Sequence, residues 1–260
     1  MARAIWKGVI QLPGLEVPVK LYSAVQDQGV HFRLLDEKKL QPVKQRMVNP
    51  ETDEPVPSDQ VQKGFEVEPG RFVLLEEEEL TALEPPESRD IEVQRFVPRD
   101  SIPHAWFDRA YYLGPDGEDG DYFAFAQALE KQAHAGVATW VMRKNDYAGA
   151  VLAHDGYLML VTLRHAGEVV PASALPAPGG RKPDEREIKM AQQLVSALED
   201  ELDMTQFRDE YRERVLALVE AKASGKTLPL KKARRKKAAD VSLGKLLEAS
   251  LKRTKERRVA

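Results

Sequence analysis

VATWVMRKNDYAGAVLAHDGYLMLVTL, residues 137–163, holds three short apolar segments separated by polar turns. We expect strands over Val137–Met142, Tyr147–Ala153 and Tyr157–Leu163. Short apolar runs bounded by turn residues are typical of strands. The stretch therefore predicts a β body.

The region before it has the same character. Ala4–Ile10 (AIWKGVI), Val17–Ala24 (VPVKLYSA), Val30–Leu35 (VHFRLL), Ile91–Val97 (IEVQRFV) and Trp106–Leu113 (WFDRAYYL) are short and rich in β-branched and aromatic residues. Many short strands with few helices favour an antiparallel barrel or sandwich. Because aromatic residues of alternating strands usually pack inward, we predict these aromatic side chains in the core: Trp6, Phe32, Phe65, Phe72 and Trp140.

Three local patterns interrupt the strands. Gly64–Glu68 and Arg71–Leu75 flank Pro69-Gly70, a strong turn signal, and predict a hairpin. Glu76–Leu83 predicts one or two helical turns before Pro85-Pro86. Phe123–Gln132 has helical periodicity and predicts a helix.

In the C-terminal part the sequence pattern changes from that of strands to that of helices. Residues 171–183 contain several prolines and glycines and predict a linker, followed by a helical arm over 184–225. The first helix is expected over Asp184–Leu202. Asp203 and Gln206 resemble a capping box for a second helix. Its apolar stripe, a predicted packing surface, consists of Phe207, Tyr211, Val215 and Leu218.

Charge is distributed very unevenly. Lys222–Ala260 holds 14 of the 39 basic residues and three acids, a net charge of +11, which leaves −14 for residues 1–221 and gives the total of −3. Such asymmetry indicates a partner of opposite charge, nucleic acid or an anionic membrane surface. A solubilising tail is the alternative. Residues 226–260 are expected to form a basic, partly disordered extension with a short amphipathic helix over Asp240–Leu251.

No motif indicates an enzyme. The chain has no cysteine, and its five histidines show no metal-ligand spacing. Ser224-Gly225-Lys226-Thr227 ends like a phosphate-binding loop but lacks the first glycine, so we interpret it as a helix C-cap. We predict no catalytic residue, no metal and no cofactor. No apolar run is long enough to span a membrane and no secretory signal is evident, so we expect a cytoplasmic protein.

Several segments together resemble one family, bacterial Ku, the homodimeric DNA end-binding protein of non-homologous end joining. They are Arg3–Ile10 with Val17–Tyr22, Lys63–Leu75, Ile91–Val97, Tyr111–Asp116 (YYLGPD), Leu163-Arg164 with Glu168-Val169, and Tyr211–Lys222 (YRERVLALVEAK). The resemblance covers about residues 3–225. It implies a Ku-type β-barrel core with a bridge over residues 1–170 and a ring of two copies around a duplex end. It also implies recruitment of an ATP-dependent DNA ligase, no cofactor, and association with the nucleoid.

Candidate DNA-binding residues follow from charge and position. In the body they are Lys38, Lys39, Lys44, Arg46, Lys63, Arg71, Arg143 and Lys144. In the tail they are Lys231, Lys232, Arg234, Arg235, Lys236, Lys237, Lys252, Arg253, Lys255, Arg257 and Arg258. Besides the arm stripe, candidate partner-binding residues are Leu243, Leu246, Leu247 and Leu251.

Two other hypotheses stay open. One is a generic nucleic-acid-associated β-domain that binds through its basic tail alone. The other is a lyase acting on abasic ends through a lysine Schiff base, although no lysine is singled out for that role. The body is itself acidic, with 18 basic and 28 acidic residues over Arg3–Val170. A ring of this composition binds DNA only if its positive charge faces inward.

Overall fold

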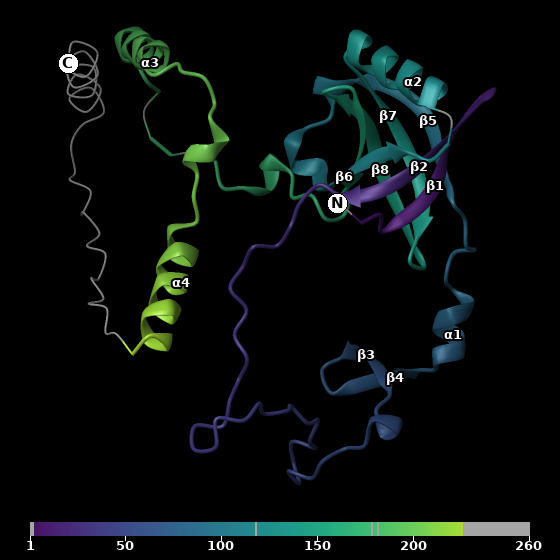
Figure 1. Cartoon of the computed structure of the whole chain (residues 1–260), viewed down its shortest axis with the longest axis vertical. Coiled ribbons are helices and arrows are strands. Elements are labelled where there is room, and N and C mark those ends of the chain that lie inside the picture. The colour runs from purple at the N-terminus through teal and green to yellow at the C-terminus, as the bar shows by residue number, and fades with distance from the viewer. Residues whose placement is uncertain (1–2, 118, 178, 181, 226–260) are drawn as a thin grey trace. The chain divides into compact units, whose positions relative to one another are not determined.

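The computed structural model describes residues 3–117, 119–177, 179–180 and 182–225 (Figure 1). The chain divides into two compact units, Met1–Gln28 with Phe32–Ala174, and Gly29–His31 with Leu175–Ala260. The tail residues that carry most of the predicted positive charge, and the predicted helix over 240–251, lie outside the described residues.

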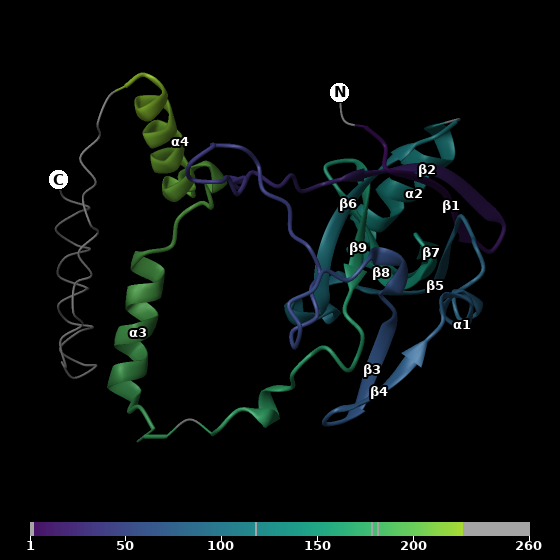
Figure 2. The same ribbon diagram turned by 90° about the horizontal axis from the view of Figure 1, so that it is seen from below.

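Seven strands of the first unit close into a barrel, and Figure 2 shows them around its wall. Their order is β1-β2-β6-β9-β8-β7-β5, and every neighbouring pair is antiparallel except β1 and β5. The strands are β1 (Trp6–Leu12), β2 (Leu15–Ser23), β5 (Asp90–Pro98), β6 (Phe107–Pro115), β7 (His134–Met142), β8 (Asn145–His154) and β9 (Tyr157–Leu163). The prediction of a mainly β fold built on a barrel is confirmed.

Alternation along the strands fills the barrel interior. Val17, Val19 and Leu21 of β2 are buried, while the residues between them are partly or fully exposed. Ile10 and Leu113 from neighbouring strands join them in one core.

Helix α2 (Asp119–Gln132) packs on the barrel and begins four residues before the predicted helix. It buries Tyr122, Phe125, Ala126 and Leu129. The hydroxyl of Tyr122 donates to the carbonyl oxygen of Leu113 and accepts from the amide of Leu158 at 2.9 Å, which ties the helix to β6 and β9.

Between β2 and β5 the chain makes a long excursion. It contains a 3-10 turn (Ser58–Gln60), the hairpin β3 (Lys63–Glu68) and β4 (Arg71–Leu75), and helix α1 (Glu77–Ala82). The hairpin and the helical turns match the predictions. The predicted strand Val30–Leu35 is wrong, because Leu35 forms one isolated bridge to Pro42 and the rest has no strand partner.

The core prediction holds for two of the five aromatic residues. Trp140 is buried and Trp6 packs partly buried against the same cluster. Phe32, Phe65 and Phe72 are 67%, 64% and 60% exposed, so placing them in the core was wrong for the single chain. Their segments cannot bury them, because a two-stranded ribbon or an irregular segment has no second layer.

The second unit contains helices α3 (Glu185–Ala197) and α4 (Glu210–Ala223), joined through a 3-10 turn (Met204–Gln206). Helix α3 therefore ends five residues before the predicted Leu202. The capping prediction was also wrong: Asp203 caps the 3-10 turn, and Asp209 is the N-cap of α4.

Two details of α4 bear on the predictions. Phe207 lies before the helix, so the predicted stripe is not one continuous helical face. At the other end, Ser224 is the C-cap and Gly225 has a φ of 69°, which confirms the C-cap interpretation of this sequence. None of the described helices is long and apolar enough to cross a membrane.

Candidate nucleic-acid interface

A cavity of about 580 Å³ lies on the rim of the barrel where β1 and β5 begin and β7 ends. We call it the basic notch. Its lining residues are Ala4, Ile5, Trp6, Lys7, Glu87, Ser88, Arg89, Val141, Met142, Arg143 and Lys144. Because β1 and β5 are parallel and β7 runs against β5, these three strand ends meet on the same rim.

The four cations of the basic notch differ in their partners. The Nζ atom of Lys7 lies 2.8 Å from a carboxylate oxygen of Asp116, and the Nζ atom of Lys144 lies 2.8 Å from one of Glu84. In the described part of the chain, no carboxylate lies within ion-pairing distance of Arg89 or Arg143. Two guanidinium groups thus remain available to an external anion.

The carboxylate of Asp116 is shared by two lysines, since Lys20 also pairs with it at 2.7 Å. Hydrogen bonds from Lys20 and Lys7 hold the pKa of Asp116 below its usual value. The same contact raises the pKa of Lys20, and the hydrogen bond to Glu84 raises the pKa of Lys144. The ion pairs of Lys7 and Lys20 with Asp116 therefore join β1, β2 and the end of β6.

The backbone of Arg89 is fixed by the barrel. Its carbonyl oxygen accepts from the amide of Val9 at 2.9 Å, one residue before β5 begins. The neighbouring carboxylate of Asp90 accepts from Gln11 and Ser88 instead, at 3.1 and 3.2 Å. The described ion pairs include none between Asp90 and Arg89.

Arg143 and Lys144 form the two-residue turn between β7 and β8, which ends at the pair Met142 and Asn145. Their φ angles are 52° and 65°, as a type I′ turn requires. Left-handed backbone costs a non-glycine residue about 1–2 kcal/mol. The turn between β8 and β9 has the same geometry and carries Asp155-Gly156, a usual sequence for it.

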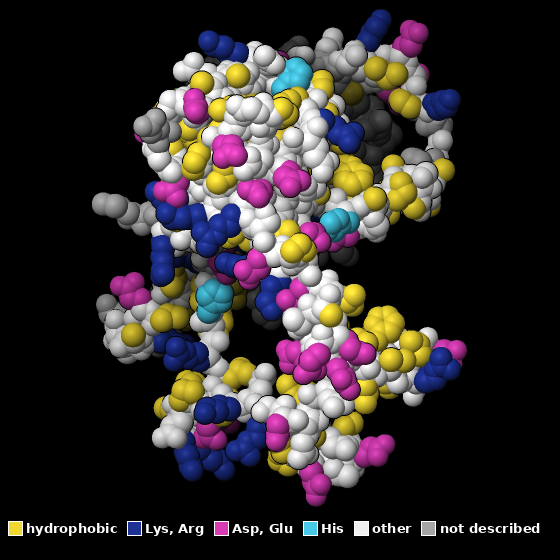
Figure 3. Space-filling model, turned by 90° about the vertical axis from the view of Figure 1, so that its right-hand side faces the viewer, with side chains coloured by type: hydrophobic (Ala, Val, Ile, Leu, Met, Phe, Trp, Pro, Cys, Tyr) yellow, Lys and Arg dark blue, Asp and Glu magenta, His cyan; other side chains and the backbone are white. Residues whose placement is uncertain are grey.

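The structure brings together few of the body residues that charge and position in the sequence singled out. Lys38, Lys39, Lys44 and Arg46 lie in the irregular part of the excursion, and Lys63 and Arg71 on the β3–β4 hairpin. Arg71 pairs with Glu68 at 3.5 Å. On the face shown in Figure 3, lysine and arginine side chains (dark blue) are spread over much of the surface, with acidic side chains (magenta) among them.

Sequence reasoning missed Lys7 and Arg89. Lys7 lies within the predicted strand Ala4–Ile10, and Arg89 comes just before the predicted strand Ile91–Val97. Both positions were visible, but only the closure of β1 against β5 places them beside the Arg143-Lys144 turn.

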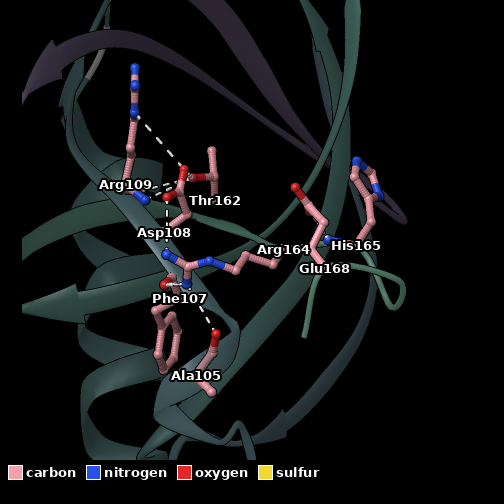
Figure 4. A network of polar contacts seen from close by, with 8 residues as sticks. All are labelled: Ala105, Phe107, Asp108, Arg109, Thr162, Arg164, His165 and Glu168. Carbon is pink, nitrogen blue, oxygen red and sulfur yellow. Dashed lines mark hydrogen bonds and ion pairs between the residues drawn. The ribbon is translucent and has the colours of Figure 1, made fainter. Parts of the chain in front are cut away.

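A second polar network lies on the same rim, where β6 begins and β9 ends (Figure 4). The guanidinium of Arg164 donates to the carbonyl oxygens of Ala105 and Phe107 and lies 3.3 Å from a carboxylate oxygen of Asp108. Buried Thr162 accepts from the amide of Arg109 at 2.9 Å. This network satisfies backbone groups at an irregularity in the β6–β9 register and is structural.

No group of histidine, aspartate and glutamate side chains among the described residues is arranged to hold a metal ion. Lys20 and Lys144 have raised pKa values, whereas a lysine that forms a Schiff base needs a lowered one. Neither lysine therefore suits the lyase hypothesis.

Comparison with known proteins supplies the family. Residues 11–190 match the family model of the Ku70/Ku80 beta-barrel domain. The chain belongs to the Ku family. The non-homologous end joining protein Ku of Anaeromyxobacter sp. (strain K) is 36% identical over 259 residues, which cover 99% of this chain and 88% of the relative. Non-homologous end joining protein Ku 2 of Geotalea uraniireducens is 35% identical over 96% of this chain and 97% of the relative.

A third relative extends the range of bacteria. The non-homologous end joining protein Ku of Pseudomonas aeruginosa is 33% identical over 86% of this chain and 78% of the relative. Ku relatives thus match this chain across both the barrel and the helical arm. The family resemblance expected from the quoted sequence segments is confirmed.

Proposed function

We propose that this Ku-family chain binds the ends of double-stranded DNA as a homodimeric ring, without reading sequence, and protects them for end joining. One observation carries the proposal: relatives called non-homologous end joining protein Ku match the chain along most of both lengths. Two arginines on the barrel rim that have no ion pair within the described part of the chain, and the net charge of +11 over Lys222–Ala260, support contact with phosphates.

Exposed apolar surface supports the homodimer. Phe65 and Val73 are opposite one another on one face of the β3–β4 hairpin, while Phe72 and Leu74 lie on the other face, and all four are exposed. A two-stranded ribbon with apolar side chains on both faces is marginal alone. A second copy that covers this hairpin would remove the apolar surface from water.

The arm offers further surface for dimer formation. Val195 and Leu198 of the α3 region are 72% and 62% exposed, and Tyr211 of α4 is 65% exposed. Val215 and Leu218 of α4 are half-buried. Tyrosine is enriched among the anchors of protein interfaces, and covering the exposed aliphatic side chains would remove apolar surface from water.

The basic tail separates this proposal from a generic nucleic-acid binder. Alanine at Lys231, Lys232, Arg234, Arg235, Lys236 and Lys237 removes six charges from the full-length chain. We expect weaker binding to every sequence and a flatter salt dependence, while the preference for linear over closed circular DNA persists. Loss of all DNA binding, measured by fluorescence anisotropy, would favour the tail-only hypothesis.

Recruitment of an ATP-dependent DNA ligase is the finer part of the proposal. The leucines of Asp240–Leu251 suit the docking of an apolar helix face into a groove. Leu247→Asp is expected to abolish stimulation of the ligase in an end-joining assay and to spare DNA binding. Loss of both activities would contradict this division. In this proposal the chain acts on DNA at the nucleoid, in the bacterial cytoplasm.

A further inference from the structure

We propose that Arg89 and Arg143 form a phosphate clamp on the barrel rim. Arg143 and Lys144 have a left-handed backbone that is unfavourable for them, and in this proposal that backbone is retained because it places Arg143 in the clamp. The clamp rests on the proposed function for its ligand, a DNA phosphate. It assigns the contact to two residues of the basic notch. The neighbouring lysines act as supports.

The lysines and the arginines of the basic notch differ in their availability to an anion. Lys7 is held by Asp116 and Lys144 by Glu84, each at 2.8 Å, so an anion would have to displace a carboxylate from either lysine. Arg89 and Arg143 have no such competitor in the described part of the chain. Glu87 also lines the cavity, and it contributes the one acidic side chain among the lining residues.

Hydrogen bonds hold the backbone that carries the two arginines. Arg89 is anchored by the hydrogen bond from Val9 to its carbonyl oxygen, and Asp90 beside it is held by Gln11 and Ser88. The carbonyl oxygen of Arg143 accepts from the side chain of Asn145 at 3.0 Å. Both arginines therefore extend from fixed backbone, and a guanidinium presents the forked donors that match phosphate oxygens.

Two hairpin turns of the same barrel carry different residues at their left-handed positions. The β8–β9 turn carries Asp155-Gly156, which suits left-handed backbone, whereas the β7–β8 turn places Arg143 and Lys144 in that conformation. Backbone that its residues disfavour persists where the side chains have another use. Arg143 at this turn lines the basic notch together with Arg89, which gives it such a use.

The test begins with the full-length Arg89→Gln and Arg143→Gln double variant on a linear duplex, titrated at several salt concentrations. Each phosphate contact contributes a slope of about 0.9, so two lost contacts lower the slope by about 1.8 for each chain bound. The affinity advantage of the unaltered protein should then shrink roughly twelvefold per chain between 50 and 200 mM salt. A matched control, Arg95→Gln with Lys131→Gln, removes the same charge away from the basic notch.

The turn has its own test. Arg143→Asn with Lys144→Gly supplies the usual type I′ sequence, so we expect a higher urea midpoint of unfolding together with weaker DNA binding. Greater stability without any loss of affinity would overturn the proposal. So would an unchanged slope in the Arg89/Arg143 variant, or an equal change in the control.

Duplexes with 5′-phosphate and 5′-hydroxyl ends distinguish two sources of the phosphate. Equal losses on both assign the clamp to backbone phosphodiesters, and a loss confined to the 5′-phosphate duplex assigns it to the terminal phosphate. Binding of the unaltered protein to closed circles tests the proposed function separately. If circles bind as well as linear DNA, the end-binding function fails while the slopes still decide whether the arginines touch phosphate.

Discussion

At the scale of single residues, Asp116 joins three strands through its carboxylate. It accepts from Lys7 of β1 and Lys20 of β2 and follows directly after β6. Its amide also donates to the carbonyl oxygen of Pro18 at 3.0 Å. The YYLGPD segment therefore closes the wall between β1, β2 and β6 by charge as well as by backbone hydrogen bonds.

Asp116→Asn should lower the urea midpoint of unfolding at pH 7. The pKa of this carboxyl is lower in the folded state than its ordinary value of 3.8, so its contribution to stability is fully present above pH 3.8 and disappears as the pH falls through the folded pKa. The difference between the two proteins should therefore vanish in strong acid. Urea titrations monitored by tryptophan fluorescence across pH 2–7 check this, and a difference independent of pH would contradict it.

Gly149→Ala should destabilise the barrel. A Cβ atom there would lie 2.6 Å from the ring of Trp140 and 2.6 Å from the backbone carbonyl oxygen of Val161, so the strands would have to shift. Overpacking of this kind costs about 1–3 kcal/mol of the free energy of unfolding. At Gly167 a Cβ would meet nothing within 4 Å, so Gly167→Ala is the control. Equal stability of the two variants in thermal melts would refute the prediction.

Tyr122→Phe tests the attachment of α2. The lost hydroxyl leaves the carbonyl oxygen of Leu113 and the amide of Leu158 without their partner in a buried place. An unsatisfied buried polar group costs about 1–3 kcal/mol, and we expect a loss of that size in the free energy of unfolding. Phe123 lies on the same helix and is 44% exposed, so Phe123→Leu should change the free energy of unfolding much less.

At the scale of elements, the sequence predicted the helices and strands whose contacts are with residues nearby in the chain. The β3–β4 hairpin follows from Pro69-Gly70, and α1 from the acidic run before the two prolines. Val30–Leu35 has strand-like composition, yet forms no strand because a strand needs a pairing partner that composition does not reveal. The second helix was predicted to begin after Asp203, but it begins after Asp209. Aspartate is a favourable N-cap at either position, so the residue type alone did not distinguish them.

The β3–β4 hairpin should contribute to the proposed dimer. Phe65→Ser with Phe72→Ser removes two exposed aromatic side chains from opposite faces of the hairpin. We expect the dimer dissociation constant to rise roughly tenfold or more, since 1.4 kcal/mol corresponds to a factor of ten, while the barrel unfolds as before. Sedimentation velocity measures the dimer. Leu83→Ser with Val170→Ser, at residues 82% and 73% exposed, is the control, and equal weakening in both would contradict the prediction.

The candidate site was only partly predictable from sequence. Arg143 and Lys144 were singled out as charged residues between strands, and they do line the basic notch. Arg89 was not, because its importance comes from β1 and β5 lying side by side although they are far apart in sequence. Whether a cation is free or paired also depends on tertiary contacts, as Lys144 and Glu84 show.

At the scale of the whole molecule, the central claim concerns DNA ends. The body is acidic, which limits its adhesion to DNA in general. Positive charge is available at the arginines of the basic notch and in the tail, which suits a protein that binds DNA only where the ring can be threaded. A ring predicts that binding requires an end over which the protein can thread.

A gel shift with the purified full-length protein tests that claim most directly. The substrates are one linear duplex, its closed circular form, and the same linear duplex with both ends blocked by bulky hairpins. We predict retention of the open linear duplex alone at physiological salt. Equal retention of all three would contradict end binding and would leave the basic tail as the DNA-binding element.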